Sequence, residues 1–121
     1  MPHLVLEYSN DLVEPIDHPA LLAALHAALD RLGIFKPEDI KSRVVAHERY
    51  RIGAGEPGQL FFHLTVSIMK GRDLAIRKQI GAELLEVLRR GVGQNWEARR
   101  SDLTVEVREM ERESYAKVVS R

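Results

Sequence analysis

Two successive halves of this chain show the same order of patterns: a strand, an amphipathic helix and a second strand. Residues 3–8 form a short apolar run of strand type. Leucines then recur at helical spacing between Pro19, which favours a helix start, and Gly33, which favours a helix stop. Residues 39–47 are predicted to form a strand, and the glycine-rich residues 51–58 a loop.

The second half repeats this order. Residues 60–68 are rich in aromatic and β-branched side chains, which favours a strand. Asp73 is predicted to cap a second helix, whose apolar stripe continues to Gly91. Residues 103–108 alternate between apolar and polar side chains, which is typical of a half-buried strand. The charged tail, residues 111–121, shows no pattern that assigns it a structure.

These patterns predict a single α+β domain, residues 1–121, built from pseudo-repeats at about residues 2–58 and 59–121. A crossover helix requires parallel strands within each half. Four strands and two helices therefore fit a two-layer fold, with both helices on one face of a four-stranded mixed sheet. The other face would be uncovered, and the net charge of zero does not oppose association. We therefore expect a small closed homo-oligomer.

Composition argues against several classes of function. The chain has 18 basic and 18 acidic residues, and this balance argues against nucleic acid as a main partner. The absence of cysteine removes disulfides and thiolate chemistry and is compatible with a reducing compartment. The longest apolar stretch, residues 19–25, is far shorter than the roughly 20 residues of a membrane span. The first residues lack a basic and then apolar signal segment, so we expect no membrane association.

The five histidines do not predict a metal site. No two of them have the His-x-x-x-His or His-x-His spacing that brings two ligands to one metal. His63 lies in an apolar strand, and we interpret it as a hydrogen-bonded core residue. His3 follows Pro2 and should point to the opposite face of the sheet, so we do not assign it the role of a base.

Pro2 is the residue with the most specific chemical potential. Methionine aminopeptidases normally remove Met1 before a small residue, which would make Pro2 the amino terminus at the tip of the first strand. A free α-amine titrates at about 7.7–8.0, and the secondary amine of proline is more basic. A neutral Pro2 nitrogen would be a general base, a role closed to an amide nitrogen. Many proteins begin with Met-Pro, however, so this pair alone is weak evidence.

Several segments together resemble the 5-carboxymethyl-2-hydroxymuconate isomerase family of the tautomerase superfamily. They are Pro2-His3-Leu4-Val5-Leu6-Glu7-Tyr8-Ser9-Asn10, Leu32-Gly33-Ile34-Phe35, Ile40-Lys41-Ser42-Arg43-Val44, His63-Leu64-Thr65-Val66-Ser67-Ile68 and Gly71-Arg72. Each segment is a weak signal, but the ordered set is fairly specific and runs from residue 2 to about residue 110.

The resemblance implies a homotrimer without a cofactor, in which the amino-terminal proline is the general base. It also implies a cytoplasmic role in the breakdown of aromatic acids such as homoprotocatechuate. The expected substrate is a small dicarboxylate or tricarboxylate, 5-carboxymethyl-2-hydroxymuconate or a similar 2-hydroxydienoate. The reaction would convert it to the conjugated 2-oxo-enoate through proton transfer by Pro2.

Such a substrate needs cations that hold its carboxylates. Arg72 is the leading candidate, because the turn after the third strand should lie near a strand-one tip of the same or a neighbouring subunit. Lys41 and Arg43 are two apart on a strand and should point to the same face. The family has arginine where this chain has Lys41, and lysine lacks the bidentate fork that suits a carboxylate. Tyr50 and Phe62 are candidates for lining an apolar pocket, although core packing suits Phe62 better.

Two alternatives stay open at this point. The chain could be a non-catalytic trimeric ligand-binding protein of the same fold, and retention of Met1 would favour that interpretation. It could also catalyse another reaction of the superfamily, such as hydration or dehalogenation of an unsaturated acid. Those reactions tend to need a charged Pro2 and an extra carboxylate that activates water, and Glu7 is the one acidic residue of the first strand.

Overall fold

The computed structural model describes residues 1–121 and contains four strands and two long helices. The strands are β1 (His3–Ser9), β2 (Lys41–His47), β3 (Gln59–Met69) and β4 (Arg100–Met110). The long helices are α1 (His18–Arg31) and α2 (Leu74–Gly91), and α3 (Asn95–Ala98) is short. Two 3₁₀ turns, η1 (Pro37–Asp39) and η2 (Arg112–Ser114), precede β2 and follow β4.

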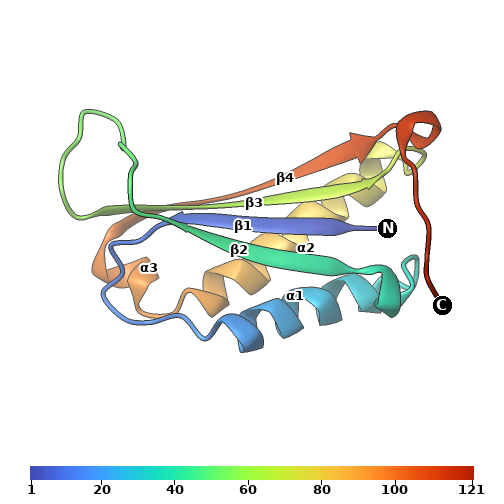
Figure 1. Ribbon diagram of the computed structural model, residues 1–121. Helices are drawn as coiled ribbons and strands as arrows, with labels where there is room; N and C mark the ends of the chain where they lie inside the picture. The colour runs from blue at the N-terminus through green and yellow to red at the C-terminus, as the bar shows by residue number, and fades with distance from the viewer.

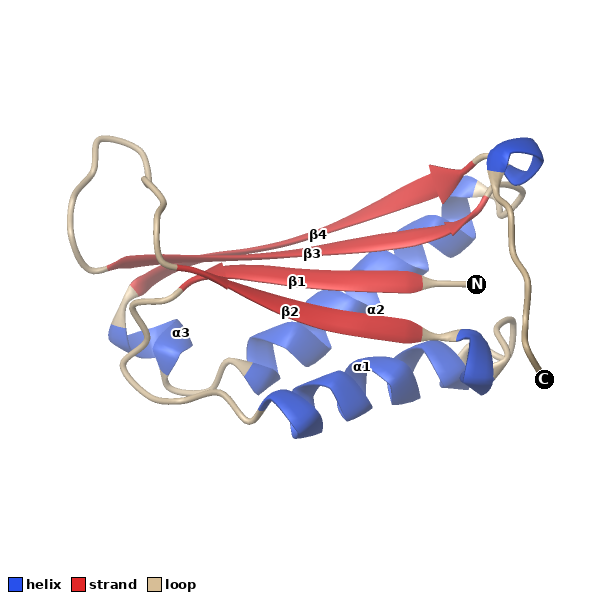
Figure 2. Ribbon diagram, in the orientation of Figure 1, coloured by secondary structure: helices blue, strands red, loops and turns tan.

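The strands form one mixed sheet in the order β2-β1-β3-β4. β1 is parallel to β2, β3 is parallel to β4, and the central pair β1 and β3 is antiparallel. Both long helices lie on the same side of the sheet, as Figures 1 and 2 show. The predicted two-layer fold is therefore confirmed. Neither α1 nor α2 combines the length and the apolar character of a bilayer-spanning helix.

Local signals begin and end the helices where the sequence predicts. The Asp17 carboxylate accepts a hydrogen bond from the Ala20 amide at 3.0 Å, which caps the start of α1. Gly33, with a φ of 70°, follows the end of this helix in the left-handed conformation that favours glycine. Asp73 caps α2 through the Ile76 amide at 2.9 Å.

The core lies between the sheet and the helices. Its fully buried side chains alternate along β1 and β3 and recur at helical spacing on α1 and α2; they include Leu4, Leu6, Phe62, Leu64, Val66, Leu25, Leu29, Ile80, Leu84 and Leu88. Because side chains alternate along a strand, the residues between the buried ones point to the other face of the sheet. That face carries no helix (Figure 1).

The helix-free face is polar and partly exposed. Glu7 and His47 pair across β1 and β2 at 2.9 Å. His63 pairs with Glu106 of β4 at 3.4 Å, and its Nδ1 lies 2.6 Å from the Thr104 hydroxyl. The interpretation of His63 as a core residue is thus wrong for the single chain, although its hydrogen bonding is as expected. The strand's period of two places it on the helix-free face, because its neighbours Phe62 and Leu64 are buried.

Element boundaries differ where tertiary contacts decide them. β2 begins at Lys41 rather than at residue 39, because the preceding residues close a 3₁₀ turn in which the Ile40 amide donates to the Pro37 carbonyl at 3.2 Å. β4 is longer than predicted, since it pairs with β3 along its whole length, from Arg100 to Met110. The sequence patterns also gave no sign of α3.

Asn95, in α3, is fully buried and joins two distant segments. Its Oδ1 accepts from the Val13 amide at 2.7 Å and from the Glu14 amide at 3.3 Å. Its Nδ2 donates to the Glu14 carbonyl at 3.1 Å and to the Val92 carbonyl at 3.0 Å. One side chain thus satisfies four backbone groups and fixes the β1–α1 connection against the end of α2.

We predict that Asn95→Ala lowers the free energy of unfolding by about 2–4 kcal/mol, because it leaves backbone groups of this connection without partners. The neighbouring Gln94 is exposed, and Gln94→Ala should change the free energy by no more than about 0.5 kcal/mol. Urea denaturation of both variants measures the difference. Equal stability of the two variants would contradict this role of Asn95.

Candidate active site

Pro2 lies at the amino-terminal end of the central strand β1. It is buried and on the same side of the sheet as Leu4, while His3 points to the helix-free face, as predicted. The Pro2 carbonyl accepts a hydrogen bond from the Lys41 amide at 3.1 Å. Parallel pairing of β1 with β2 continues from there, beginning with His3 opposite Lys41. The pairing therefore holds Pro2 beside the start of β2.

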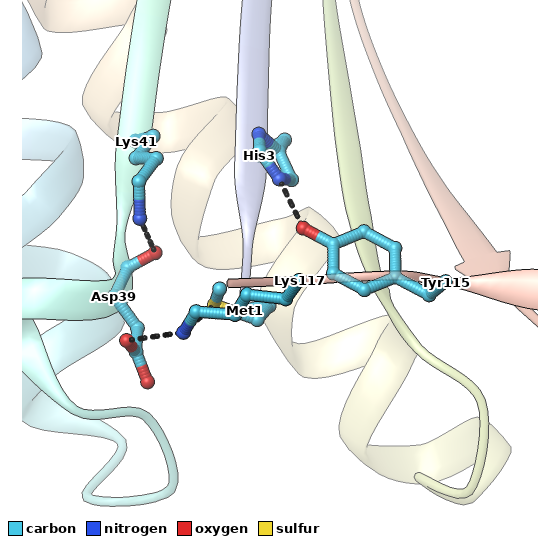
Figure 3. Close-up of polar contacts among 6 residues, drawn as sticks. All are labelled: Met1, His3, Asp39, Lys41, Tyr115 and Lys117. Carbon is cyan, nitrogen blue, oxygen red and sulfur yellow. Dashed lines mark hydrogen bonds and ion pairs between the residues drawn. The ribbon is translucent and has the colours of Figure 1, made fainter. Parts of the chain in front are cut away.

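A cluster of charged groups surrounds this end of β1 (Figure 3). The Lys41 ammonium lies 3.4 Å from the Asp39 carbonyl. The Asp39 carboxylate pairs with Lys117 at 3.5 Å, and the Lys117 ammonium also lies 3.4 Å from the Met1 sulfur. Groups from η1, β2 and the carboxyl-terminal tail thus meet at the amino terminus.

These groups perturb an amine at this position. Burial lowers the pKa of the Met1 amine most strongly, because the charged form loses solvation. The Asp39 carboxylate raises this pKa, while the charges of Lys117, Lys41 and Arg112 lower it. The net effect is a lowered pKa, so the neutral amine is favoured relative to a fully exposed terminus.

His3 links Arg43 to the tail. An Arg43 Nη2 lies 3.0 Å from His3 Nδ1, and the Tyr115 hydroxyl lies 2.8 Å from His3 Nε2. Because arginine has only donors, Nδ1 is the acceptor, and Nε2 of the neutral ring carries the proton and donates it to the Tyr115 oxygen. Burial and the charges of Arg43 and Lys41 lower the pKa of His3, which favours this neutral form.

Arg72 lies in the turn after β3, and β3 ends beside the start of β1, with Ser67 opposite His3. Its Nη2 donates to the Ile34 carbonyl at 3.0 Å, and its guanidinium lies 5.7 Å from the centre of the Phe35 ring. Arg72 is thus held against the α1–β2 connection at the Pro2 end of the sheet. It is exposed and forms no ion pair within the chain.

The two aromatic candidates lie elsewhere. Tyr50 follows β2 at the opposite end of the sheet and is 39% exposed. Its ring lies edge-on to that of Phe61, with the two ring centres 6.1 Å apart. Phe62 is fully buried and stacks on Tyr8 at 5.5 Å, on the helix side of the sheet. Phe62 is therefore a core residue and not part of a pocket lining, because its position in the strand turns it toward the helices.

Three residues near Pro2 had no recognisable signal in the sequence: Asp39, Tyr115 and Lys117. Asp39 resembled part of a strand, and the tail resembled a solvated charged segment. Asp39 lies near Pro2 because β2 pairs with β1, and Tyr115 and Lys117 lie near it because of the path of the chain after β4; no local pattern encodes either.

None of the four most prominent concavities of the single chain includes Pro2. One of them, of about 570 Å³, lies at the far end of β1, beside Tyr8 and His18. The Pro2 end of the sheet carries several cations, among them Lys41, Arg112 and Lys117. Its chemistry suits an anionic ligand placed against a partly buried amine.

Comparisons with known proteins indicate the family of this chain. The sequence model of a family described as 5-carboxymethyl-2-hydroxymuconate isomerase matches residues 2–119. The chain is 32% identical over 110 residues to a 5-carboxymethyl-2-hydroxymuconate Delta-isomerase of Escherichia coli, which covers 91% of this chain and 87% of that protein.

Solved structures give the same result. A 5-carboxymethyl-2-hydroxymuconate isomerase from Deinococcus radiodurans R1 superposes with a TM-score of 0.87 at 32% identity, over 97% of this chain and 88% of that chain. A fused 4-OT symmetric trimer shares the fold at 18% identity, with a TM-score of 0.77 over 98% of this chain and 92% of that chain. The chain therefore has the tautomerase fold and belongs to the 5-carboxymethyl-2-hydroxymuconate isomerase family.

Proposed function

We propose that this protein is an isomerase that converts 5-carboxymethyl-2-hydroxymuconate, or a similar 2-hydroxydienoate, to its conjugated 2-oxo-enoate. The observation that carries the proposal is the position of Pro2 in a chain of this family: it is buried at the tip of a central strand, next to an amino terminus whose charged neighbours include Lys41, Arg112 and Lys117. The reaction belongs to the breakdown of aromatic acids such as homoprotocatechuate.

The reaction moves one proton and consumes no other reactant. After removal of Met1, the neutral Pro2 nitrogen takes the proton from the 2-hydroxyl of the substrate. The oxygen electron pair forms the 2-oxo group, the conjugated double bonds shift, and electron density develops at a distant carbon. The Pro2 ammonium then returns the proton to that carbon and is again neutral. Each step requires an amine that is readily protonated and deprotonated near pH 7.

Burial and nearby cations make Pro2 suitable for this role. One cation about 6 Å from the amine, at an effective dielectric of about 20, is worth roughly 2.8 kcal/mol, or about two pKa units. A shift of this size brings a basic secondary amine close to neutrality. The pKa of the Met1 amine, one residue before Pro2, is lowered, which supports a lowered pKa for the Pro2 amine.

Arg72, Lys41 and Arg43 bind the substrate carboxylates in this proposal. Arg72 presents a planar guanidinium that is already oriented by the Ile34 carbonyl and the Phe35 ring, which suits a bidentate carboxylate contact. Lys41 and Arg43 lie on β2 beside the start of β1. The same charges stabilise the dienolate that forms when the 2-hydroxyl loses its proton.

We also infer that the active protein is a cytoplasmic homotrimer. The helix-free face of the sheet is uncovered in a single chain, and an uncovered sheet face favours association. Association through that face would cover it and would reduce the access of water to the adjoining end of the sheet. A drier site strengthens every charge interaction that the reaction uses.

Pro2→Ala should reduce turnover of 5-carboxymethyl-2-hydroxymuconate at least about a hundredfold, because it removes the secondary amine that serves as general base. The decay of the dienol absorbance measures this, on protein whose intact mass shows that Met1 is absent. Lys78→Gln is a matched control, since Lys78 is exposed on α2. Size-exclusion chromatography should give the same oligomer for all three proteins, and full activity of Pro2→Ala would refute the mechanism.

Arg72→Ala should raise KM for a dicarboxylate substrate by about tenfold, and by clearly less for a monocarboxylate analogue, because one charge-assisted pair is lost. Steady-state kinetics with both substrates gives the ratio, and Lys78→Ala serves as the control for loss of an exposed cation. If the ratio of the two KM values stays at the wild-type value, Arg72 does not bind a substrate carboxylate.

A further inference from the structure

The chain after β4 turns back across the end of the sheet that carries Pro2 (Figures 1 and 3). The turn is fixed by η2, where Arg112 Nε donates to the Lys70 carbonyl at 2.9 Å. Beyond it, the Tyr115 hydroxyl meets His3 at 2.8 Å, and Lys117 meets Asp39 at 3.5 Å. The tail therefore has two separate side-chain contacts with residues that flank Pro2.

Asp39 is an obstacle for a basic amine at this position. A carboxylate beside an amine stabilises the protonated form, and a protonated Pro2 cannot accept the hydroxyl proton. Asp39 is also the one neighbour that raises the pKa of the Met1 amine. A site that depends on a neutral amine therefore needs a counter-charge for Asp39.

Lys117 is the cation that contacts this carboxylate. Lys41 is bonded through its ammonium to the Asp39 carbonyl instead, and Arg112 donates to the Lys70 carbonyl. The side chains of Lys117 and Asp39 are 40% and 27% exposed, so solvent screens their interaction only in part. The Tyr115 contact with His3 holds the tail on the side of β1 where Lys117 reaches Asp39.

We propose that the carboxyl-terminal tail is part of the Pro2 site, where Lys117 neutralises the Asp39 carboxylate and so keeps the proline nitrogen free to accept a proton. The inference rests on the proposed function. Lys117 is a positioning residue here, since it acts on the amine through Asp39. The charged groups around the amino terminus are Asp39 from η1, Lys41 from β2, Arg112 from η2 and Lys117 from the tail, with His3 neutral on the adjacent face.

The experiment compares Lys117→Gln, Asp39→Asn and the double variant with the wild type. The Pro2 amine is titrated directly by nitrogen-15 NMR, on protein whose mass shows that Met1 is absent, and the pH profile of kcat/KM is measured in parallel. Arg121→Gln is the control, because Arg121 belongs to the same tail and forms no ion pair or hydrogen bond. Lys117→Arg keeps the charge and should behave as the wild type.

Lys117→Gln should raise the pKa of the Pro2 amine by at least about half a unit, because the Asp39 carboxylate then lacks its ion-pair partner. The acidic limb of kcat/KM moves to higher pH by the same amount, and activity below that pKa falls about threefold. Asp39→Asn should lower the pKa, and the double variant should return close to the wild-type value. Opposite shifts in the two single variants distinguish charge compensation from simple docking of the tail.

Shifts in the same direction for both single variants, or no shift in either, would overturn the proposal and leave the tail with a purely structural role. The NMR titration does not need turnover. If the wild type fails to convert the substrate, the proposed function fails, while the titration still decides whether Lys117 and Asp39 control the Pro2 amine.

Discussion

The pairing of β1 on both of its edges is the constraint on which the rest of the structure depends. β2 runs parallel to it on one side, and β3 runs antiparallel on the other. This arrangement brings the start of β1, the start of β2 and the end of β3 to the same end of the sheet. Pro2, Lys41 and the turn with Arg72 are consequently neighbours, although they are far apart in the sequence.

Alternation along β1 then separates two kinds of environment. Pro2 and Leu4 lie on the helix side, where they are buried, while His3 lies on the helix-free face and contacts Arg43 and Tyr115. An amine at the first position is thus partly desolvated, which lowers its pKa, and its nearest charged neighbours come from other segments. The strand provides the burial, and the surrounding segments provide the charges.

The charges at this end are not uniform in sign, and this matters for the chemistry. A set of cations alone would favour both a neutral amine and the binding of an anionic substrate. The Asp39 carboxylate opposes the neutral form of the amine, and the Lys117 ammonium forms an ion pair with this carboxylate. In the mechanism that we propose, the site combines binding and proton transfer only while the tail remains in place. Association through the helix-free face would cover the partly exposed side chains of that face.

The sequence by itself determined the four strands, the two long helices and their order, because hydrophobic periodicity and the caps Asp17 and Asp73 act locally. It also indicated Pro2, since the position after Met1 is a chemical feature of the chain itself. Only the tertiary structure decided that Tyr115 meets His3 and that Lys117 meets Asp39 near the amino terminus. This outcome depends on strand pairing and on the path of the tail, which arise from contacts between residues distant in sequence and leave no local pattern.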